Sequence, residues 1–267
     1  MKRFGMIGMA LVAVLMCVNF AGCSKEEVSA NQGNEDVGGG EEVVVTKEKK
    51  LVKMVGSLGS DSETYEFSYD DKGRVTKASV EKRYGVNHYK ETEHYVWGDD
   101  AIMVRKESNN NYDSSYSYTL TNGLVQHCPE NDENYLYNSS NRLIGIEYKN
   151  TVYKNDIIWE KDKLVSSKYT NTAHNTYEFC VFTYGKTCKK GYSPFVPERV
   201  TGSLLPMAHP EILGMRTNQL PITYTTGDNK GGSLENITYE FDNEGYISKM
   251  KFELEGGDVS AYTLTWK

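Results

Sequence analysis

Neighbouring carboxylates are the side chains of this 267-residue sequence whose spacing most directly suggests catalysis. In enzymes that hydrolyse glycosidic bonds, two such groups flank one cleft about 5 to 10 Å apart. The sequence offers three groups, which are Asp70 with Asp71, Asp99 with Asp100, and Glu130 with Asp132 and Glu133. Each group lies where a turn between strands is expected, and acidic side chains are common there because they bind nearby backbone amides. We therefore predict no catalytic residue among them, and an extracellular polymer hydrolase using paired carboxylates stays an alternative.

Nucleophiles and metal ligands are no better supported. His127 and Cys128 are adjacent, so on a strand they point to opposite faces and are poorly placed to share a proton. His88 and His94 would share one strand face, yet two histidines do not complete a zinc site. The sequence contains no Gly-Xaa-Ser-Xaa-Gly motif and no glycine-rich phosphate loop. It predicts a protein that is not an enzyme and that has no metal site and no cofactor.

The cysteine at position 23 suggests a covalent modification, the attachment of a lipid to its thiol. A basic start and an apolar run at residues 6–20 precede the small pair Ala21-Gly22 and then Cys23. This order resembles the signal of bacterial lipoproteins, which is cut before a cysteine whose thiol takes acyl chains such as palmitate. The run of about 15 apolar residues is shorter than the ~20 that span a bilayer. We expect a signal peptide at residues 1–22 and attachment to the membrane through a lipid on Cys23.

The segment after this cysteine is acidic and lacks aromatic side chains. Residues 23–43 hold six carboxylates against one base, Lys25, and contain three consecutive glycines. This composition buries too little apolar surface to fold, so we expect a lipidated, disordered tether and a single domain at 44–267. Lys25 followed by two glutamates resembles the export signal of surface lipoproteins in gut-dwelling Gram-negative bacteria, which implies display on the exterior of the outer membrane. Removing residues 1–22 changes the formal net charge from −7 to −9, so no nucleic-acid partner is expected.

Three cysteines remain after processing and acylation, at positions 128, 180 and 188. An odd number excludes a complete set of disulfides. A bridge between Cys180 and Cys188 across a hairpin stays open, and we favour free thiols at Cys128, Cys180 and Cys188.

From about residue 44, short stretches rich in Tyr, Val, Ile, Phe and Thr alternate with turns of Asp, Asn and Gly, which predicts an all-β fold. A unit recurs in which two large apolar or aromatic residues, two positions apart, precede a polar turn and an apolar strand. The unit occupies residues 67–75, 95–104, 116–125, 135–144, 157–165 and 239–247. Since residues two apart share a strand face, we predict an antiparallel meander of repeated hairpins that forms a large curled or barrel-like sheet.

The repeat is interrupted between residues 165 and 238. Residues 177–184 predict one further strand, and five of the six prolines then fall within 194–221. The apolar residues of 203–215 predict one or two short helical turns, cut by Pro206 and Pro210. We expect this short Pro-rich helical insertion near 194–221 to pack as a plug or cap on one end of the sheet.

The hairpin units allow comparison with known families. Residues 69–75, Tyr-Asp-Asp-Lys-Gly-Arg-Val, resemble one unit of the YD repeats of large secreted shell-forming proteins, although most other units lack the Gly-Arg pair. The region from about residue 50 to 267 is more similar to a domain of unknown function in surface lipoproteins of gut bacteria. Residues 209–221 are similar to a late insertion in that family. This resemblance implies a porin-like fold and no assigned activity.

A membrane-spanning barrel is nevertheless not expected. Its strands need apolar lipid-facing positions along ~9 to 11 residues each. Residues 81–84 and 88–94 instead place charges on both strand faces, although the last strand, 261–266, resembles a barrel-closing segment. We predict a water-soluble open or curled sheet.

The aromatic content exceeds what one core of this size needs, with twenty Tyr, three Trp and eight Phe. The recurring positions in the hairpin units are expected to form a core ladder of Tyr69, Trp97, Tyr118, Tyr137 and Trp159. The tyrosines outside the ladder are predicted to be exposed ligand contacts, namely Tyr84, Tyr89, Tyr112 and Tyr192. Tyrosine suits such a role because its ring stacks on sugars and peptide side chains while its hydroxyl forms hydrogen bonds.

These observations together favour a surface-exposed outer-membrane lipoprotein that acts as a non-catalytic binding or accessory module. Its expected ligand is a glycan, a peptide or a lipid. Besides the hydrolase, a second alternative is a structural scaffold within an outer-membrane protein complex.

Overall fold

The structure is a computed structural model that describes residues 48–110, 113–149 and 152–267. The predicted signal peptide, the lipid site at Cys23, the tether and Tyr112 lie outside these residues.

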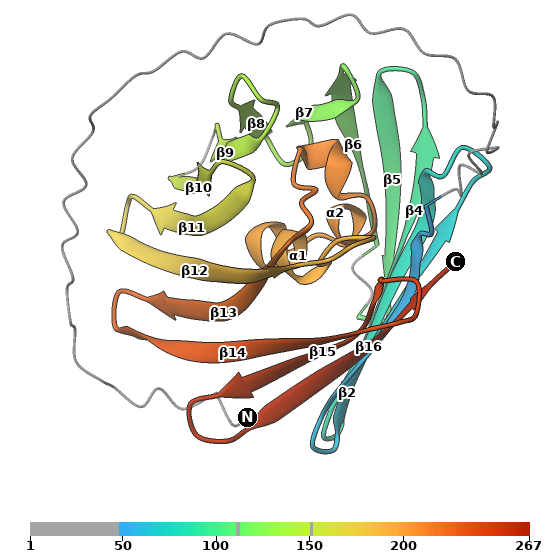
Figure 1. Cartoon of the computed structure of the whole chain (residues 1–267). Coiled ribbons are helices and arrows are strands. Elements are labelled where there is room, and N and C mark those ends of the chain that lie inside the picture. The colour runs from blue at the N-terminus through green and yellow to red at the C-terminus, as the bar shows by residue number, and fades with distance from the viewer. Residues whose placement is uncertain (1–47, 111–112, 150–151) are drawn as a thin grey trace, which may run out of the picture.

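Sixteen antiparallel strands form one closed barrel in which each strand pairs with its neighbours in sequence (Figure 1). The first and last strands pair antiparallel, with Met54 opposite Leu264, so the sheet closes on itself. The strands are β1 (Leu51–Leu58), β2 (Asp61–Tyr69), β3 (Val75–Tyr84), β4 (Asn87–Trp97), β5 (Ala101–Ser108), β6 (Ser114–Thr121), β7 (Leu124–Cys128), β8 (Glu133–Tyr137), β9 (Leu143–Tyr148), β10 (Tyr153–Glu160), β11 (Lys163–Asn171), β12 (Thr176–Thr187), β13 (Gln219–Asp228), β14 (Gly231–Phe241), β15 (Ile247–Leu254) and β16 (Val259–Trp266). The predicted all-β meander is confirmed, and the sheet is a closed barrel rather than an open curl.

The turns between hairpins repeat one hydrogen-bonding pattern. At Asp70, Asn138 and Asp242, the side-chain Oδ1 accepts hydrogen bonds of 2.9–3.0 Å from the backbone amides two and four residues later. Two of these turns contain a glycine in the left-handed region, such as Gly73 with a φ of 77°. The carboxylates there stabilise the turn, as predicted for Asp70.

The Pro-rich insertion forms three short helices between β12 and β13. They are α1 (Phe195–Thr201), α2 (Leu204–Ala208) and the 3-10 helix η1 (Pro210–Leu213). Figure 1 shows these helices inside the ring of strands, and all five residues of α2 are buried. Residues 188–218 are called the plug below, and the predicted plug is confirmed. None of the helices in the described residues is long and apolar enough to cross a membrane.

The plug defines two different ends of the barrel. Because consecutive strands run in opposite directions, the turns after all even-numbered strands lie at the end where β12 enters the plug, called the plugged end. The chain also enters β1 and leaves β16 there, where Lys50 and Lys267 exchange two backbone hydrogen bonds. The turns after odd-numbered strands lie at the opposite end.

A ring of aromatic side chains, the aromatic collar, surrounds the plugged end. Each lies near the end of an even-numbered strand and donates a hydrogen bond of 2.6–2.8 Å to a carbonyl near the start of the preceding strand. The collar consists of Tyr69, Trp97, Tyr137, Trp159, Tyr184, Tyr239 and Trp266. Four of its members belong to the predicted core ladder, and the fifth ladder residue, Tyr118, is buried deeper in the barrel. Of the predicted ladder, Tyr118 thus lies in the core, and the four collar residues are half-buried and pack against it.

The charged side chains of several strands face outward, although the outer face also carries exposed apolar residues such as Val96 and Met103. On β15, for example, Met250 and Phe252 are buried while Lys251 and Glu253 are exposed. Ion pairs cross the outer face, as between Lys53 of β1 and Glu66 of β2 at 2.8 Å. Lipid-facing bands of membrane barrels are apolar at such outward positions.

Candidate functional site

A cavity of about 180 Å³ lies between the inner wall of β4–β9 and the plug, and is called the lumen cavity below. Its polar lining consists of Glu91, Glu93, Lys106, Tyr116, Tyr118, Asn131, Glu133, Tyr135, Tyr148, Thr201 and Ser203. Asn131 is exposed and belongs to the turn after β7 at the opposite end of the barrel. The plug thus forms the floor of the cavity, and the rim lies at the end away from the plug.

The floor of the cavity depends on how the plug chain turns. α1 ends at Gly202, whose φ of 63° lies in the left-handed region that favours glycine. This turn brings Thr201 and Ser203 against the cavity, while Leu205 and Ile212 pack beneath it.

Glu93 is the most buried carboxylate of the cavity, with a relative exposure of 4%. Its side chain accepts hydrogen bonds from the hydroxyls of Tyr95 and Tyr116, the latter at 3.1 Å. Burial raises the pKa of Glu93 above its ordinary value, and this outweighs the tyrosine hydroxyls, which act in the opposite direction. Glu93 is therefore a desolvated acceptor in the lumen wall.

Glu133 on β8 has a similar environment. It accepts a hydrogen bond of 2.7 Å from Tyr135. Burial raises the pKa of Glu133, against hydrogen bonds from Tyr135 and Asn131 that lower it. Glu91, the third carboxylate, accepts a hydrogen bond from Tyr89 and forms an ion pair of 2.6 Å with Lys106.

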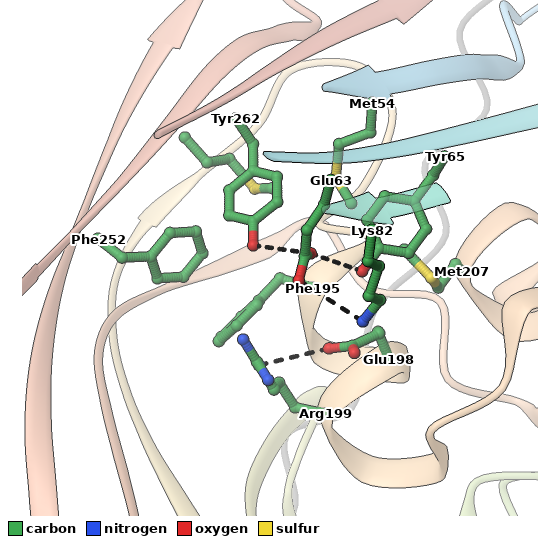
Figure 2. Close-up of a pocket in the computed structure, with 11 residues that line it drawn as sticks. Met54, Glu63, Tyr65, Lys82, Phe195, Glu198, Arg199, Met207, Phe252 and Tyr262 are labelled. Atoms are coloured by element: carbon green, nitrogen blue, oxygen red, sulfur yellow. Dashed lines mark hydrogen bonds and ion pairs between the residues drawn. The ribbon is translucent and has the colours of Figure 1, made fainter. Parts of the chain in front are cut away.

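A second, smaller cavity of about 40 Å³ is lined by Glu63 (Figure 2). Glu63 lies near the start of β2, toward the end of the barrel opposite the plugged end. Figure 2 shows Tyr65, Tyr262 and Lys82 pointing at this carboxylate. The two hydroxyls lie 2.8 and 3.2 Å from its oxygens, and the Lys82 ammonium lies at 3.6 Å. Burial raises the pKa of Glu63, but these groups together with Tyr84 outweigh it, so the net pKa is lowered. Since one water needs about 10–15 Å³, this space is large enough for only a few waters.

Sequence reasoning missed the carboxylates that face the lumen. Glu63, Glu93 and Glu133 each stand two residues before a tyrosine on the same strand face, and accept a hydrogen bond from it. The sequence does contain a signal for these carboxylates. It is a Glu-Xaa-Tyr pattern within a strand in which the glutamate occupies an inward position. The sequence groups Glu133 with the turn residues Glu130 and Asp132, whereas the structure places Glu133 on β8 in the lining of the lumen cavity. Glu130 is exposed and binds the Ser117 amide at 2.9 Å.

The predicted ligand contacts do not form one surface. Tyr84 lies at the end of β3 with 41% exposure, and its hydroxyl donates to Glu63. Tyr89 is half-buried, and its hydroxyl donates to Glu91 of the lumen cavity.

The prediction that Tyr192 is exposed is wrong, because the exposed fraction of this residue is only 4%. It belongs to the plug, where its ring packs edge-on against Trp266 at 5.5 Å and its hydroxyl donates to the Met207 carbonyl at 2.9 Å. Tyrosine count alone did not reveal that the plug needs aromatic packing inside the barrel.

Within the described residues, no group of three or more His, Cys, Asp or Glu side chains is arranged to hold a metal ion. The three described cysteines, Cys128, Cys180 and Cys188, are free and buried.

Comparison with known proteins places the fold alone. No protein-family model matches the chain. No curated protein matches it either. A crystal structure of a porin-like protein from Bacteroides uniformis is similar, with 15% identity and a TM-score of 0.58 over 82% of this chain and 96% of that one. A porin-like protein from Bacteroides vulgatus is matched with 10% identity and a TM-score of 0.40, over 82% of this chain and 99% of that one. The chain thus has a fold similar to that of the porin-like protein from Bacteroides uniformis.

Proposed function

We propose that this protein is a lipid-anchored module of the outer-membrane surface that binds a small polar ligand in the lumen cavity and does not transform it. The observation that carries this proposal is the cavity itself, a space of about 180 Å³ lined by carboxylates and tyrosines above a buried plug. Concave sites with a few convergent polar groups are the usual places where proteins bind small molecules.

The barrel is suited to holding a ligand rather than conducting one. Side chains of the plug such as Leu205, Met207 and Ile212 are almost completely buried and fill the lumen at one end. Charged residues on the outer face argue that the barrel stands in water beside the membrane and not within its hydrocarbon core. The similarity to a porin-like protein supports an outer-membrane association.

The position of the chain ends supports an orientation. The chain enters β1 at the plugged end, so a tether leading from Cys23 attaches there. The rim of the lumen cavity lies at the opposite end. In a lipid-anchored protein the cavity then faces away from the membrane, toward ligands in the surrounding fluid.

Hydrolysis is the second candidate, because Glu93 and Glu133 line one cavity and both have raised pKa values, as a general acid requires. Tyrosine hydroxyls already bind both carboxylates, which favours a fixed acceptor role. Turnover of glycosides by the purified protein that is lost in Glu93→Gln would establish the hydrolase instead.

A binding screen with a lumen-filling variant tests the proposed function. The lipid-free chain, defined as residues 23–267 with Cys23→Ala, is screened against glycans, peptides and bile-type lipids by calorimetry. Ser203→Trp places an indole in the cavity, and Ser115→Trp places one on the exposed outer face of β6 as the matched control.

We expect the ligand to bind the parent and Ser115→Trp with the same affinity and to lose at least tenfold in affinity for Ser203→Trp. Equal binding to both tryptophan variants would contradict a site in the lumen.

A further inference from the structure

We propose that the lumen cavity selects small organic cations that carry a primary ammonium group, an inference that rests on the proposed function of this cavity. The argument uses three properties of its lining: charge, hydrogen-bonding capacity and aromatic surface.

The charge of the lining is unbalanced. Three carboxylates, Glu91, Glu93 and Glu133, line the cavity together with a single cationic side chain, Lys106. Lys106 forms its ion pair with Glu91 at 2.6 Å. Glu93 accepts hydrogen bonds from tyrosine hydroxyls and also feels the charge of Lys106, whereas Glu133 has only hydroxyl and amide partners. One cation thus serves three carboxylates, and a bound cation compensates buried negative charge better than any neutral group.

The hydrogen-bonding capacity left on the carboxylates Glu93 and Glu133 is for donors. The hydroxyls of Tyr116 and Tyr135 already donate to Glu93 and Glu133, at 3.1 and 2.7 Å. A carboxylate has about four acceptor sites, so each retains capacity for a further donor. A primary ammonium offers three donors and no acceptor. A sugar hydroxyl, which both donates and accepts, matches this wall less well.

The tyrosine rings form a continuous aromatic wall beside these carboxylates. Tyr116 and Tyr118 pack edge to face with ring centroids 5.4 Å apart, and Tyr118 and Tyr135 do so at 6.2 Å. The face of an aromatic ring attracts cations, and the attraction strengthens where water is excluded. The same rings, with Val125 and Ile146, provide apolar surface for the carbon skeleton of the ligand.

The volume limits the ligand to a small molecule. A cavity of about 180 Å³ is far larger than one water requires, yet lies below the ~300 Å³ of typical drug-sized pockets. A single ring or short chain bearing one ammonium group fits this limit.

The test compares three probes of similar shape and different charge: cyclohexylamine, which is a cation at pH 7.5, cyclohexanol and cyclohexanecarboxylate. Binding to the lipid-free chain is measured by ligand-observed NMR and calorimetry. We expect cyclohexylamine to bind at least about tenfold more tightly than cyclohexanol, equivalent to about 1.4 kcal/mol, and cyclohexanecarboxylate to bind most weakly.

Variants that replace a carboxylate by a carboxamide test which residues produce the selectivity for cations. Glu93→Gln and Glu133→Gln should each weaken cyclohexylamine binding at least about fivefold while cyclohexanol binding stays within twofold. Glu240→Gln is the matched control, since Glu240 lies on the outer face of β14 with a side chain 70% exposed. Circular dichroism checks that each variant is folded. The comparison of the three probes uses only the parent chain, so it tests the selectivity for cations even if a variant does not fold.

The outcomes separate this inference from the proposed function. Cyclohexanol binding as tightly as cyclohexylamine, or no binding of cyclohexylamine at millimolar concentration, overturns the selection of cations. If in either case another ligand still binds in a manner abolished by Ser203→Trp, the lumen remains a binding site. If binding of every ligand survives Ser203→Trp, the proposed function fails as well.

Discussion

At the scale of single residues, tyrosine hydroxyls beside the inward carboxylates partly offset the burial that raises their pKa. Glu93 and Glu133 receive these bonds from tyrosines two residues later on the same strand face, where side chains are close enough to meet. A buried carboxylate without such partners would cost several kcal/mol. The tyrosine hydroxyls therefore reduce the cost of negative charge in a lumen that also presents apolar and aromatic groups.

Glu211 in the plug is the carboxylate whose ionisation should stabilise the fold. Burial raises its pKa, but hydrogen bonds from His209, at 2.8 Å, and from Arg216 outweigh burial and lower the pKa from 4.5 to about 2. A lowered pKa means that the stabilisation is complete above pH 4.5 and is lost as the pH falls toward 2.

Glu211→Gln should therefore lower the free energy of unfolding by about 1–2 kcal/mol at pH 7, a value discounted because the side chain is 38% exposed. The difference from the parent chain should shrink steadily below pH 4.5 and be small by pH 2. Urea unfolding of both proteins across this range measures it, and a difference that does not change with pH would contradict the stated role of Glu211.

The three cysteine thiols should react only slowly with thiol reagents in the folded protein. Burial raises the pKa of Cys128, Cys180 and Cys188 to about 11, so little thiolate exists near pH 8. In the lipid-free chain we expect a thiol reagent such as DTNB to react about 100-fold more slowly than with an exposed cysteine. In guanidinium chloride three thiols per chain should titrate, whereas only one would titrate if Cys180 and Cys188 were bridged.

At the scale of elements, the plug and the aromatic collar reinforce each other. The collar joins neighbouring strands through side chain to backbone bonds at the plugged end, and the plug packs against its inner side. Tyr192 of the plug, for instance, contacts Trp266 of the collar.

Leu205→Ala in α2 tests how much the plug contributes to stability. Leu205 is 2% exposed, so its truncation leaves a cavity and should lower the free energy of unfolding by about 2–4 kcal/mol. Leu136→Ala makes the same change on the outer face of β8, where the side chain is 38% exposed, and should change stability by no more than about 0.5 kcal/mol. Similar losses in the two variants would mean that the plug is not part of the cooperative core.

The hairpins were predictable because their signals are local. Residues such as Asp70 and Asn138 serve their own turns, and the aromatic residues before them recur in register. Closure of the sheet was not predictable, since the pairing of β1 with β16 joins residues more than 200 positions apart. The lumen cavity was not predictable either, because β4, β8 and the plug bring Glu93, Glu133 and Ser203 together only after closure.

At the scale of the whole molecule, the fold places the proposed attachment point and the proposed binding site at opposite ends of the barrel. Residues 48–50 lie at the plugged end, and the cavity rim lies at the other. The lipid anchor and the binding site are thus expected to act independently.

Cys23→Ala tests the proposed attachment in cells. The variant should be missing from the outer-membrane fraction, while its barrel still folds because the burial that stabilises it involves no lipid. Protease added to intact cells should degrade the parent protein if it faces outward. Protection from protease would contradict surface display, and partitioning of Cys23→Ala into detergent would contradict the lipid anchor.

The most direct test of a negatively charged, accessible lumen is the labelling rate of a cysteine placed in it. Ser203→Cys, in the lipid-free chain, reacts with methanethiosulfonate reagents that carry either a positive or a negative charge. Ser115→Cys on the outer face of β6 is the reference, and the native cysteines are buried. Ser203 makes no side-chain cap hydrogen bond to α2, so its replacement removes none.

We predict that Ser203→Cys reacts with the cationic reagent at least about tenfold faster than with the anionic one, because like charges repel the anion at the carboxylate-lined wall. The two rates should agree within about threefold in Ser115→Cys, where charges are exposed and screened. A Ser203→Cys variant that reacts with neither reagent, or equally with both, would contradict an open, acidic binding chamber.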